Sequence, residues 1–152
     1  MKSVLLIIVF NLINYNNEIM LIRSLYLNAS KSEYHCNKFG EKINEKEDVS
    51  SILIKGYEAC FYFIKCKFID NPIEKISYFN KGKKLLESLI EENPDAIELR
   101  FLRYSIQKNL PRVLLYYDNI EKDLNFVYKN IDNIKDSKTK NFILSSVKSI
   151  KN

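Results

Sequence analysis

The chain has 152 residues, of which 46% are hydrophobic and 28% are charged, and this is the composition of a globular domain rather than a disordered segment. Three glycines and three prolines are too few for the many turns of an all-β domain, so the composition favours long helices. The formal net charge of +5 does not by itself indicate a polyanionic partner, because acidic residues are interleaved with the lysines.

Residues 1–16 form a segment that differs from the rest of the chain. Lys2 precedes an apolar run at positions 4–10, and a basic start followed by a short apolar stretch is the layout of a secretory signal peptide. The run is shorter than the roughly 20 apolar residues that span a bilayer. Residues 14–17, however, offer no pair of small side chains for a signal peptidase. We therefore expect either a signal peptide or an N-terminal apolar helix at 1–16.

Two helical patterns follow this segment. Apolar residues recur at helical spacing from 22 to 43, with residues 30–32 expected to bend or split the helix and a polar loop expected at 44–48. The next pattern, from 49 to 68, has two apolar stripes, which is typical of a helix packed between two neighbours. Gly56 lies inside this pattern and predicts a close helix–helix contact, since its helix propensity is poor.

The middle of the chain is divided by prolines. Asn71 and Pro72 predict a helix start, with the asparagine as cap and the proline in the first turn. That helix should end before Pro94, because the residue preceding a proline avoids the helical region. Asp95 is expected to cap the next helix, and residues 109–111 should break the chain again.

The last third carries further start signals. Residues 112–117 are apolar and long enough for one helical turn. Asp118 is expected to cap a helix, with Glu121 as its capping-box partner, and Asp136 is expected to begin the final helix. No linker separates these elements, so the sequence predicts one all-α domain of about six helices over residues 17–152.

The stretch 77–106 resembles a junction between tetratricopeptide repeats (TPR). Gly82, Leu86 and Leu89 occupy positions at which the second helix of such a repeat carries small and apolar packing residues. Pro94 occupies the position of the repeat's closing proline. The resemblance implies antiparallel, TPR-like helical hairpins.

From 19 to 150 the chain also resembles a group of small uncharacterised bacterial helical proteins that carry an export leader. This resemblance implies an exported protein of the periplasm or cell envelope, with no known activity; the alternative is a cytoplasmic location. The residues that carry the resemblance are 22–26, 29–31, 56–57, 98–100, 103–107 and 118–123.

The sequence offers little for metal, cofactor or catalytic chemistry. His35 is the only histidine, and on a helix it diverges by about 100° from the adjacent Cys36, so the two cannot easily share an ion. Cys36, Cys60 and Cys66 lack a C-x-x-C spacing, and we expect buried thiols, with a Cys36 disulfide as the alternative in an exported protein. Three scattered glycines cannot form a phosphate-binding loop. We expect no catalytic residues, no metal and no cofactor.

The candidate binding site is one face of a helix. Arg100, Arg103, Tyr104 and Gln107 lie at three- and four-residue spacings and therefore share that face. Two arginines on one face can clamp a carboxylate or a phosphate. Alternatively, the same arginines form structural ion pairs with the acidic segment 118–123, and their long stems cover apolar surface.

These patterns predict a binding or scaffold module of unknown ligand, exported and acting through a protein partner rather than as an enzyme. The mature chain should have no membrane span. The alternative is a cytosolic basic helical protein that contacts nucleic acid or another polyanion, although the interleaved acidic residues make nucleic acid the less favoured partner.

Overall fold

The computed structural model describes the backbone of residues 2–45 and 51–151 and the side chains of residues 16–45 and 51–151. Within these ranges the chain forms seven α-helices and three short 3₁₀ turns, with no strand, which confirms the all-α class. The helix beyond the expected six arises because residues 30–32 separate α1 from α2. The elements are α1 (Lys2–Ala29), α2 (Glu33–Asn44), α3 (Ile52–Lys65), η1 (Cys66–Phe68), α4 (Pro72–Glu92), α5 (Ile97–Asn109), η2 (Arg112–Leu114), α6 (Ile120–Asn130), η3 (Ile131–Asn133) and α7 (Ser137–Lys151).

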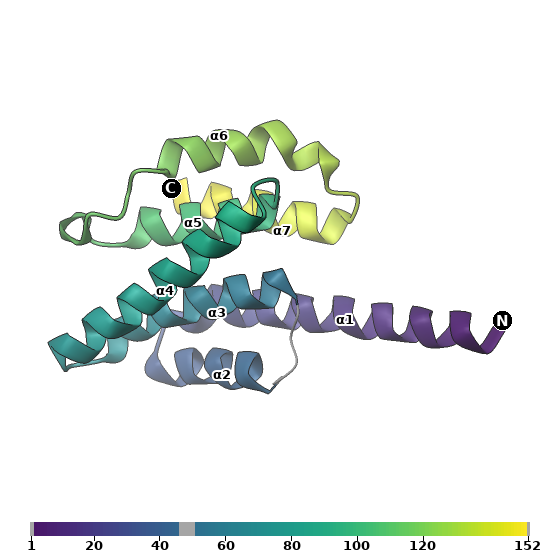
Figure 1. Ribbon diagram of the computed structural model, residues 1–152, viewed down its shortest axis with the longest axis horizontal. Helices are drawn as coiled ribbons and strands as arrows, with labels where there is room; N and C mark the ends of the chain where they lie inside the picture. The colour runs from purple at the N-terminus through teal and green to yellow at the C-terminus, as the bar shows by residue number, and fades with distance from the viewer. Residues whose placement is uncertain (1, 46–50, 152) are drawn as a thin grey trace.

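Successive helices reverse direction, with α1, α2 and α3 in one group, α5, α6 and α7 in another, and α4 running obliquely between the two (Figure 1). Two helices hold the groups together. Helix α3 contacts α1, α2, α4 and α5, while α5 contacts α3, α4, α6 and α7. The prediction that the helix with two apolar stripes packs between neighbours is therefore confirmed, since α3 is that helix.

Helix α1 is continuous from Lys2 to Ala29, so residue 16 is not a helix boundary. Its N-terminal part extends beyond the other helices (Figure 1). The described side chains of α1 that enter the core begin at Ile19 and continue with Ile22, Tyr26 and Ala29. No helix in the described part of the chain combines the length and the apolar character needed to cross a membrane.

Several helix starts follow local sequence signals. The Ser32 side chain accepts a hydrogen bond from the His35 amide, which separates α2 from α1 as expected at residues 30–32. Asn71 caps α4 by accepting from two amides of its first turn, with Pro72 at the first position. Asp136 accepts from the Thr139 amide at the start of α7. The predicted split at 30–32, the predicted cap at Asn71 and the predicted helix start at Asp136 are confirmed.

Two capping predictions are wrong. The N-cap of α5 is Ala96 rather than Asp95, because a turn closed by the Ala96 amide and the Asn93 carbonyl delays the helix start. Helix α6 is preceded by Asn119 rather than Asp118. There the Asn119 amide donates to the side chain of Gln107 on α5, so a tertiary contact replaces the expected capping box.

The remaining segments match their patterns in the described range. Helix α4 ends at Glu92, before Pro94, and α5 ends at Asn109. The expected turn at 112–117 is the short 3₁₀ turn η2. Of the expected polar loop 44–48, residues 46–48 lie outside the described residues, and so does residue 49 of the following pattern.

Two glycines, Gly56 and Gly82, lie where neighbouring helices approach each other closely. A Cβ atom added at Gly56 would lie 2.5 Å from Leu99 Cδ2 and 3.2 Å from Leu102 Cδ1, so α3 and α5 approach each other closely, as predicted. A Cβ atom at Gly82 would lie 2.9 Å from the Ala59 carbonyl oxygen. In both places the missing side chain lets two apolar helix faces meet.

The three cysteines are all free. Cys36 and Cys60 are buried in the core and Cys66 is partly buried, which confirms the expectation of buried thiols for the first two. Burial raises the pKa of Cys36 to about 11, so this thiol is a poor nucleophile at neutral pH. His35, beside it, is exposed.

Candidate functional site

Helix α5, which carries the four predicted binding residues, has the largest share of buried residues among the helices whose side chains the structure describes throughout. Every residue from Phe101 to Gln107 is buried, because α5 contacts helices on several sides. The charged residues Glu98 and Arg103 are buried with this apolar stretch. A buried charge is tolerated only when it is paired and hydrogen-bonded, so the partners of these residues define what α5 can do.

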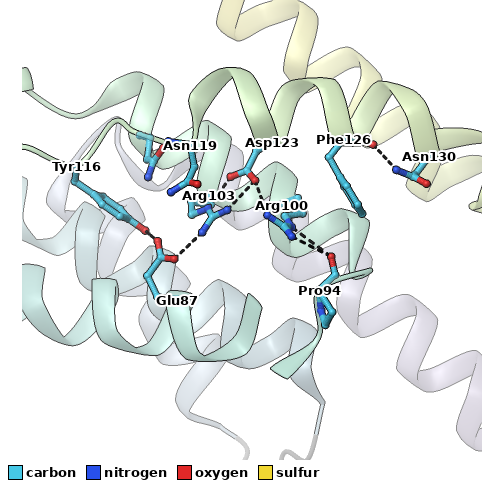
Figure 2. Close-up of polar contacts among 10 residues, drawn as sticks. Glu87, Pro94, Arg100, Arg103, Tyr116, Asn119, Asp123, Phe126 and Asn130 are labelled. Carbon is cyan, nitrogen blue, oxygen red and sulfur yellow. Dashed lines mark hydrogen bonds and ion pairs between the residues drawn. The ribbon is translucent and has the colours of Figure 1, made fainter. Parts of the chain in front are cut away.

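Arg103 lies between two carboxylates (Figure 2). Its Nε and Nη2 atoms donate to Asp123 on α6 at 2.6 and 2.8 Å, which is the bidentate arrangement that suits a guanidinium. Its Nη1 donates to Glu87 on α4 at 2.6 Å. Burial alone would lower the pKa of Arg103, but the hydrogen bond and charge of Asp123 outweigh burial and raise it.

Arg100 lies one helical turn earlier and reaches the same aspartate. Its Nη1 donates to Asp123 at 3.1 Å, and its Nε and Nη2 donate to the Pro94 carbonyl at 3.3 Å (Figure 2). Its guanidinium carbon lies 5.0 Å from the ring centroid of Phe126 on α6, a cation–π distance. Asp123, which is fully buried, thus receives hydrogen bonds from two arginines.

Tyr104 and Gln107 complete the predicted set, and both are buried. The Gln107 Oε1 atom accepts from the Asn119 amide at 3.1 Å, while its buried Nε2 has no hydrogen-bond partner among the described residues. Burial raises the pKa of Tyr104. The four residues therefore lie along the side of α5 that faces α6, as their spacing predicts.

Two residues that sequence reasoning missed close this cluster. Tyr116 donates from its hydroxyl to the second oxygen of Glu87 at 2.6 Å (Figure 2), and its ring stacks on Phe63 of α3 with centroids 5.6 Å apart. We name the group of Glu87, Arg100, Arg103, Tyr116 and Asp123 the Arg103 cluster. It joins α4, α5 and α6 to the loop that follows α5.

A second ionic group lies on the opposite side of α5 and was not predicted. Arg23 of α1 donates through Nε and Nη2 to the two oxygens of Glu98 at 2.8 and 2.6 Å. The Tyr57 hydroxyl of α3 donates to Glu98 at 2.6 Å. All three residues are buried. We name Arg23, Tyr57 and Glu98 the Arg23 cluster, which ties α1 and α3 to the first turn of α5.

The electrostatics of the Arg23 cluster favour the ionised pair. Burial would lower the pKa of Arg23, but the hydrogen bond and charge of Glu98 reverse this and raise it. Burial and the adjacent Glu98 carboxylate raise the pKa of Tyr57 well above its usual value, so this phenol remains a donor at neutral pH. The Arg23 guanidinium also lies 5.4 Å from the ring centroid of Phe142 on α7.

In both clusters the charged side chains are paired with each other. Each arginine is matched to a carboxylate of another helix, and each cluster adds a tyrosine hydroxyl that points at a carboxylate oxygen. Among the described residues, no group of three or more His, Cys, Asp or Glu side chains is placed to hold a metal ion. The two clusters fix the position of α5 relative to the helices around it.

An apolar cleft, shallow and largely open to solvent, lies where α3, α5 and α7 begin. Its volume is about 560 Å³. The residues Ile52, Leu53, Ala96, Ile97 and Ile134 supply most of its lining, and Glu98, Asp95 and Thr139 lie at its polar side. Large apolar pockets with a few polar groups are the usual form of a binding site. The cleft, unlike the Arg103 cluster, therefore offers apolar surface to a partner.

No protein-family model, curated protein or solved structure matches the chain. Both resemblances inferred from the sequence accordingly remain predictions. The function of the chain has to be inferred from its own residues and their contacts.

Proposed function

We propose that the protein is a binding or scaffold module, built of TPR-like helical hairpins, that acts through a protein partner and carries out no reaction of its own. The reversal of direction between successive helices (Figure 1) supports the hairpin interpretation. The internal pairing of Arg100 and Arg103 supports a structural role for the predicted binding face. Charges that hold helices in place are not available to bind a ligand without a loss of stability.

The observation that carries the proposal is the apolar cleft at the starts of α3, α5 and α7. Leu53 and Ile97 remain partly exposed there, on helices whose positions the Arg23 cluster fixes. A pre-formed apolar cleft binds a partner's apolar side chain without first paying for its own ordering. We propose that a segment of the partner protein places one or two large apolar side chains in it.

A comparison of cleft and control variants tests the proposal. Tagged wild type, Leu53→Arg and Leu21→Arg are expressed in the native cells, cross-linked and recovered, with melting curves to show that all three fold. Leu21 is the matched control, since it is an exposed leucine on α1 away from the cleft lining. We expect one protein to be recovered with wild type and with Leu21→Arg but lost with Leu53→Arg. Equal recovery with all three, or with none, contradicts the proposal.

Salt separates the polyanion alternative from this proposal. Nucleic acid that is recovered with the protein and dissociates steeply with added salt would favour the alternative. Binding to phosphates releases counterions from the nucleic acid, and added salt opposes that release. Association with a protein through an apolar cleft should change much less over the same range.

We propose further that the protein is exported and that residues 1–16 are removed. Lys2 and the apolar run 4–10 support this. Mass spectrometry of the protein from its native cells tests the proposal. We expect a terminus near Asn17 in the envelope fraction, and an intact Met1 on a cytosolic species would contradict it.

A further inference from the structure

The turn after α5 exposes three consecutive aliphatic side chains to solvent, and no other described part of the chain does so. Val113 is 83% exposed, Leu114 39% and Leu115 70%, and they follow one another in and after η2. In Figure 1 this turn lies, with the start of α4, at the end of the molecule away from the N-terminus. A soluble domain normally covers such a group of aliphatic side chains or leaves them scattered.

The backbone holds these side chains outward at a cost. Leu115 has φ 49° and ψ 43° and is the only non-glycine residue with a positive φ in the described chain. A leucine in this left-handed region is unfavourable, and glycine or asparagine would adopt it more easily. Strained residues of this kind concentrate at functional sites.

Two backbone amides of the tip are hydrogen-bonded within the turn itself. The amides of Leu114 and Leu115 donate to the carbonyls of Pro111 and Arg112, both at 3.0 Å, and Pro111 has no amide hydrogen. Behind the tip, Tyr116 is anchored in the Arg103 cluster. Backbone donors that are already bonded within a turn can leave water at a lower cost.

The residues around the tip are basic and aromatic. The Arg112 guanidinium lies 5.7 Å from the ring centroid of Tyr117, and the Lys83 ammonium lies 5.1 Å from that of Tyr116. Lys108 is exposed one turn before the loop, and Asp118 is the exposed acidic residue that follows it, so the surroundings remain net positive. Aliphatic side chains at a tip with tyrosine and basic residues behind them suit the boundary between headgroups and acyl chains.

We propose that the turn 111–117 is a membrane-contacting tip that inserts Val113, Leu114 and Leu115 into the surface of an anionic bilayer. A stable protein interface covers about 800 Å² on each partner, far more than three aliphatic side chains expose. A lipid surface needs only shallow apolar insertion and attraction between basic residues and anionic headgroups. The proposal goes beyond the proposed protein-binding function and uses a different surface.

The proposal is tested with vesicles and the full chain. Wild type should co-sediment with vesicles of phosphatidylcholine and phosphatidylglycerol, and much less with phosphatidylcholine alone. The double variant Val113→Ser with Leu115→Asn should lose at least about tenfold in affinity, which corresponds to about 1.4 kcal/mol. Asparagine tolerates the left-handed conformation, so the melting temperature should not fall. Leu21→Ser, at an exposed leucine elsewhere, should bind as wild type does.

A fluorescence arm reports the depth of insertion directly. The chain has no tryptophan, so Val113→Trp introduces a single indole at the tip. Its emission should shift to the blue with phosphatidylglycerol vesicles and remain unchanged with phosphatidylcholine alone. The proposal is overturned if wild type does not bind either vesicle or if the indole emission does not shift. Full binding by the double variant would also overturn it, because attachment would then reside elsewhere, such as the apolar run 4–10.

Discussion

The two ionic clusters on α5 use the same chemistry with different redundancy. In the Arg23 cluster a single arginine neutralises Glu98, and the Tyr57 hydroxyl is the other donor to it. In the Arg103 cluster two arginines share Asp123, and one of them also holds Glu87. The Arg23 cluster is buried throughout, whereas Glu87 keeps 36% of its side chain exposed.

This difference indicates which contacts of α5 contribute most to the stability of the fold. Removing the lone arginine leaves a buried carboxylate without a cation, which is among the costlier changes that a fold can suffer. Removing one of two arginines leaves the other in place. Glu87, in turn, can recover part of its hydration from solvent. We therefore expect the Arg23 cluster to contribute more to stability per residue than the Arg103 cluster.

The largest effect is expected for Arg23→Met. Methionine preserves much of the apolar stem but leaves Glu98 buried and unpaired, so unfolding measured in urea should show a loss of about 3–5 kcal/mol. The double variant Arg23→Met with Glu98→Met is the control, and it should recover most of the loss, because an apolar pair can replace a buried ion pair. A loss below about 1 kcal/mol in the single variant would contradict the comparison.

The two tyrosines sharpen the comparison. Tyr57→Phe removes a hydrogen bond to the buried Glu98 and should cost about 1.5–3 kcal/mol, the range for bonds to charged groups. Tyr116→Phe removes the equivalent bond to Glu87, which water can replace in part, so the cost should be smaller. Denaturant unfolding of the two variants side by side measures the difference. Equal losses would show that the exposure of Glu87 makes no difference.

Gly56→Leu tests the apolar seam between the clusters. The added side chain would meet Leu99 and Leu102, the closest α5 neighbours of Gly56, and overpacking should cost about 1–3 kcal/mol. The melting temperature should fall accordingly. An unchanged or raised melting temperature would mean that α3 and α5 can separate without loss. Gly56→Ala is a less informative control, since better helix propensity offsets the clash.

The smallest effect is expected for Arg100→Met. Arg103 still neutralises Asp123 in this variant through its two short hydrogen bonds, and the Arg100 side chain keeps 12% of its surface exposed. The loss in urea unfolding should therefore be about 1 kcal/mol or less. A loss equal to that of Arg23→Met would show that the two arginines of the Arg103 cluster do not substitute for each other.

Sequence reasoning predicted the Arg103 cluster better than the Arg23 cluster, for a physical reason. The spacing of Arg100 and Arg103 places them on one helix face, which local periodicity can predict, and the acidic segment 118–123 that contains Asp123 was the candidate partner; Glu87 and Tyr116 were missed. Arg23 and Glu98 are 75 residues apart, and no local pattern pairs them. One signal for a buried charge was available: Arg23 lies beside Ile22 and before Tyr26 in the apolar stripe, where an arginine needs an acidic partner.

The same distinction explains the helix boundaries. Ser32 and Asn71 cap their helices through amides two or three residues away, and such contacts can be predicted from the sequence. The start of α6 depends on Gln107, twelve residues away on α5, and the capping prediction for Asp118 was wrong because that tertiary contact replaced the local one. The all-α class could be predicted from periodicity, which is a local property.

The central claim is that the Arg100–Arg103 face orients helices and does not bind an anionic ligand. Melting curves of wild type and Arg103→Met, each with and without phosphate, acetate and citrate, test it most directly. The claim predicts that Arg103→Met has a lower melting temperature than wild type without any anion, with a loss in the free energy of unfolding smaller than the roughly 3–5 kcal/mol expected for a lone buried pair. Arg103→Lys should recover only part of this loss. No anion should raise the wild-type melting temperature. A wild-type melting temperature raised by one anion, together with an unliganded Arg103→Met that melts like wild type, would contradict the claim and make this face the binding site.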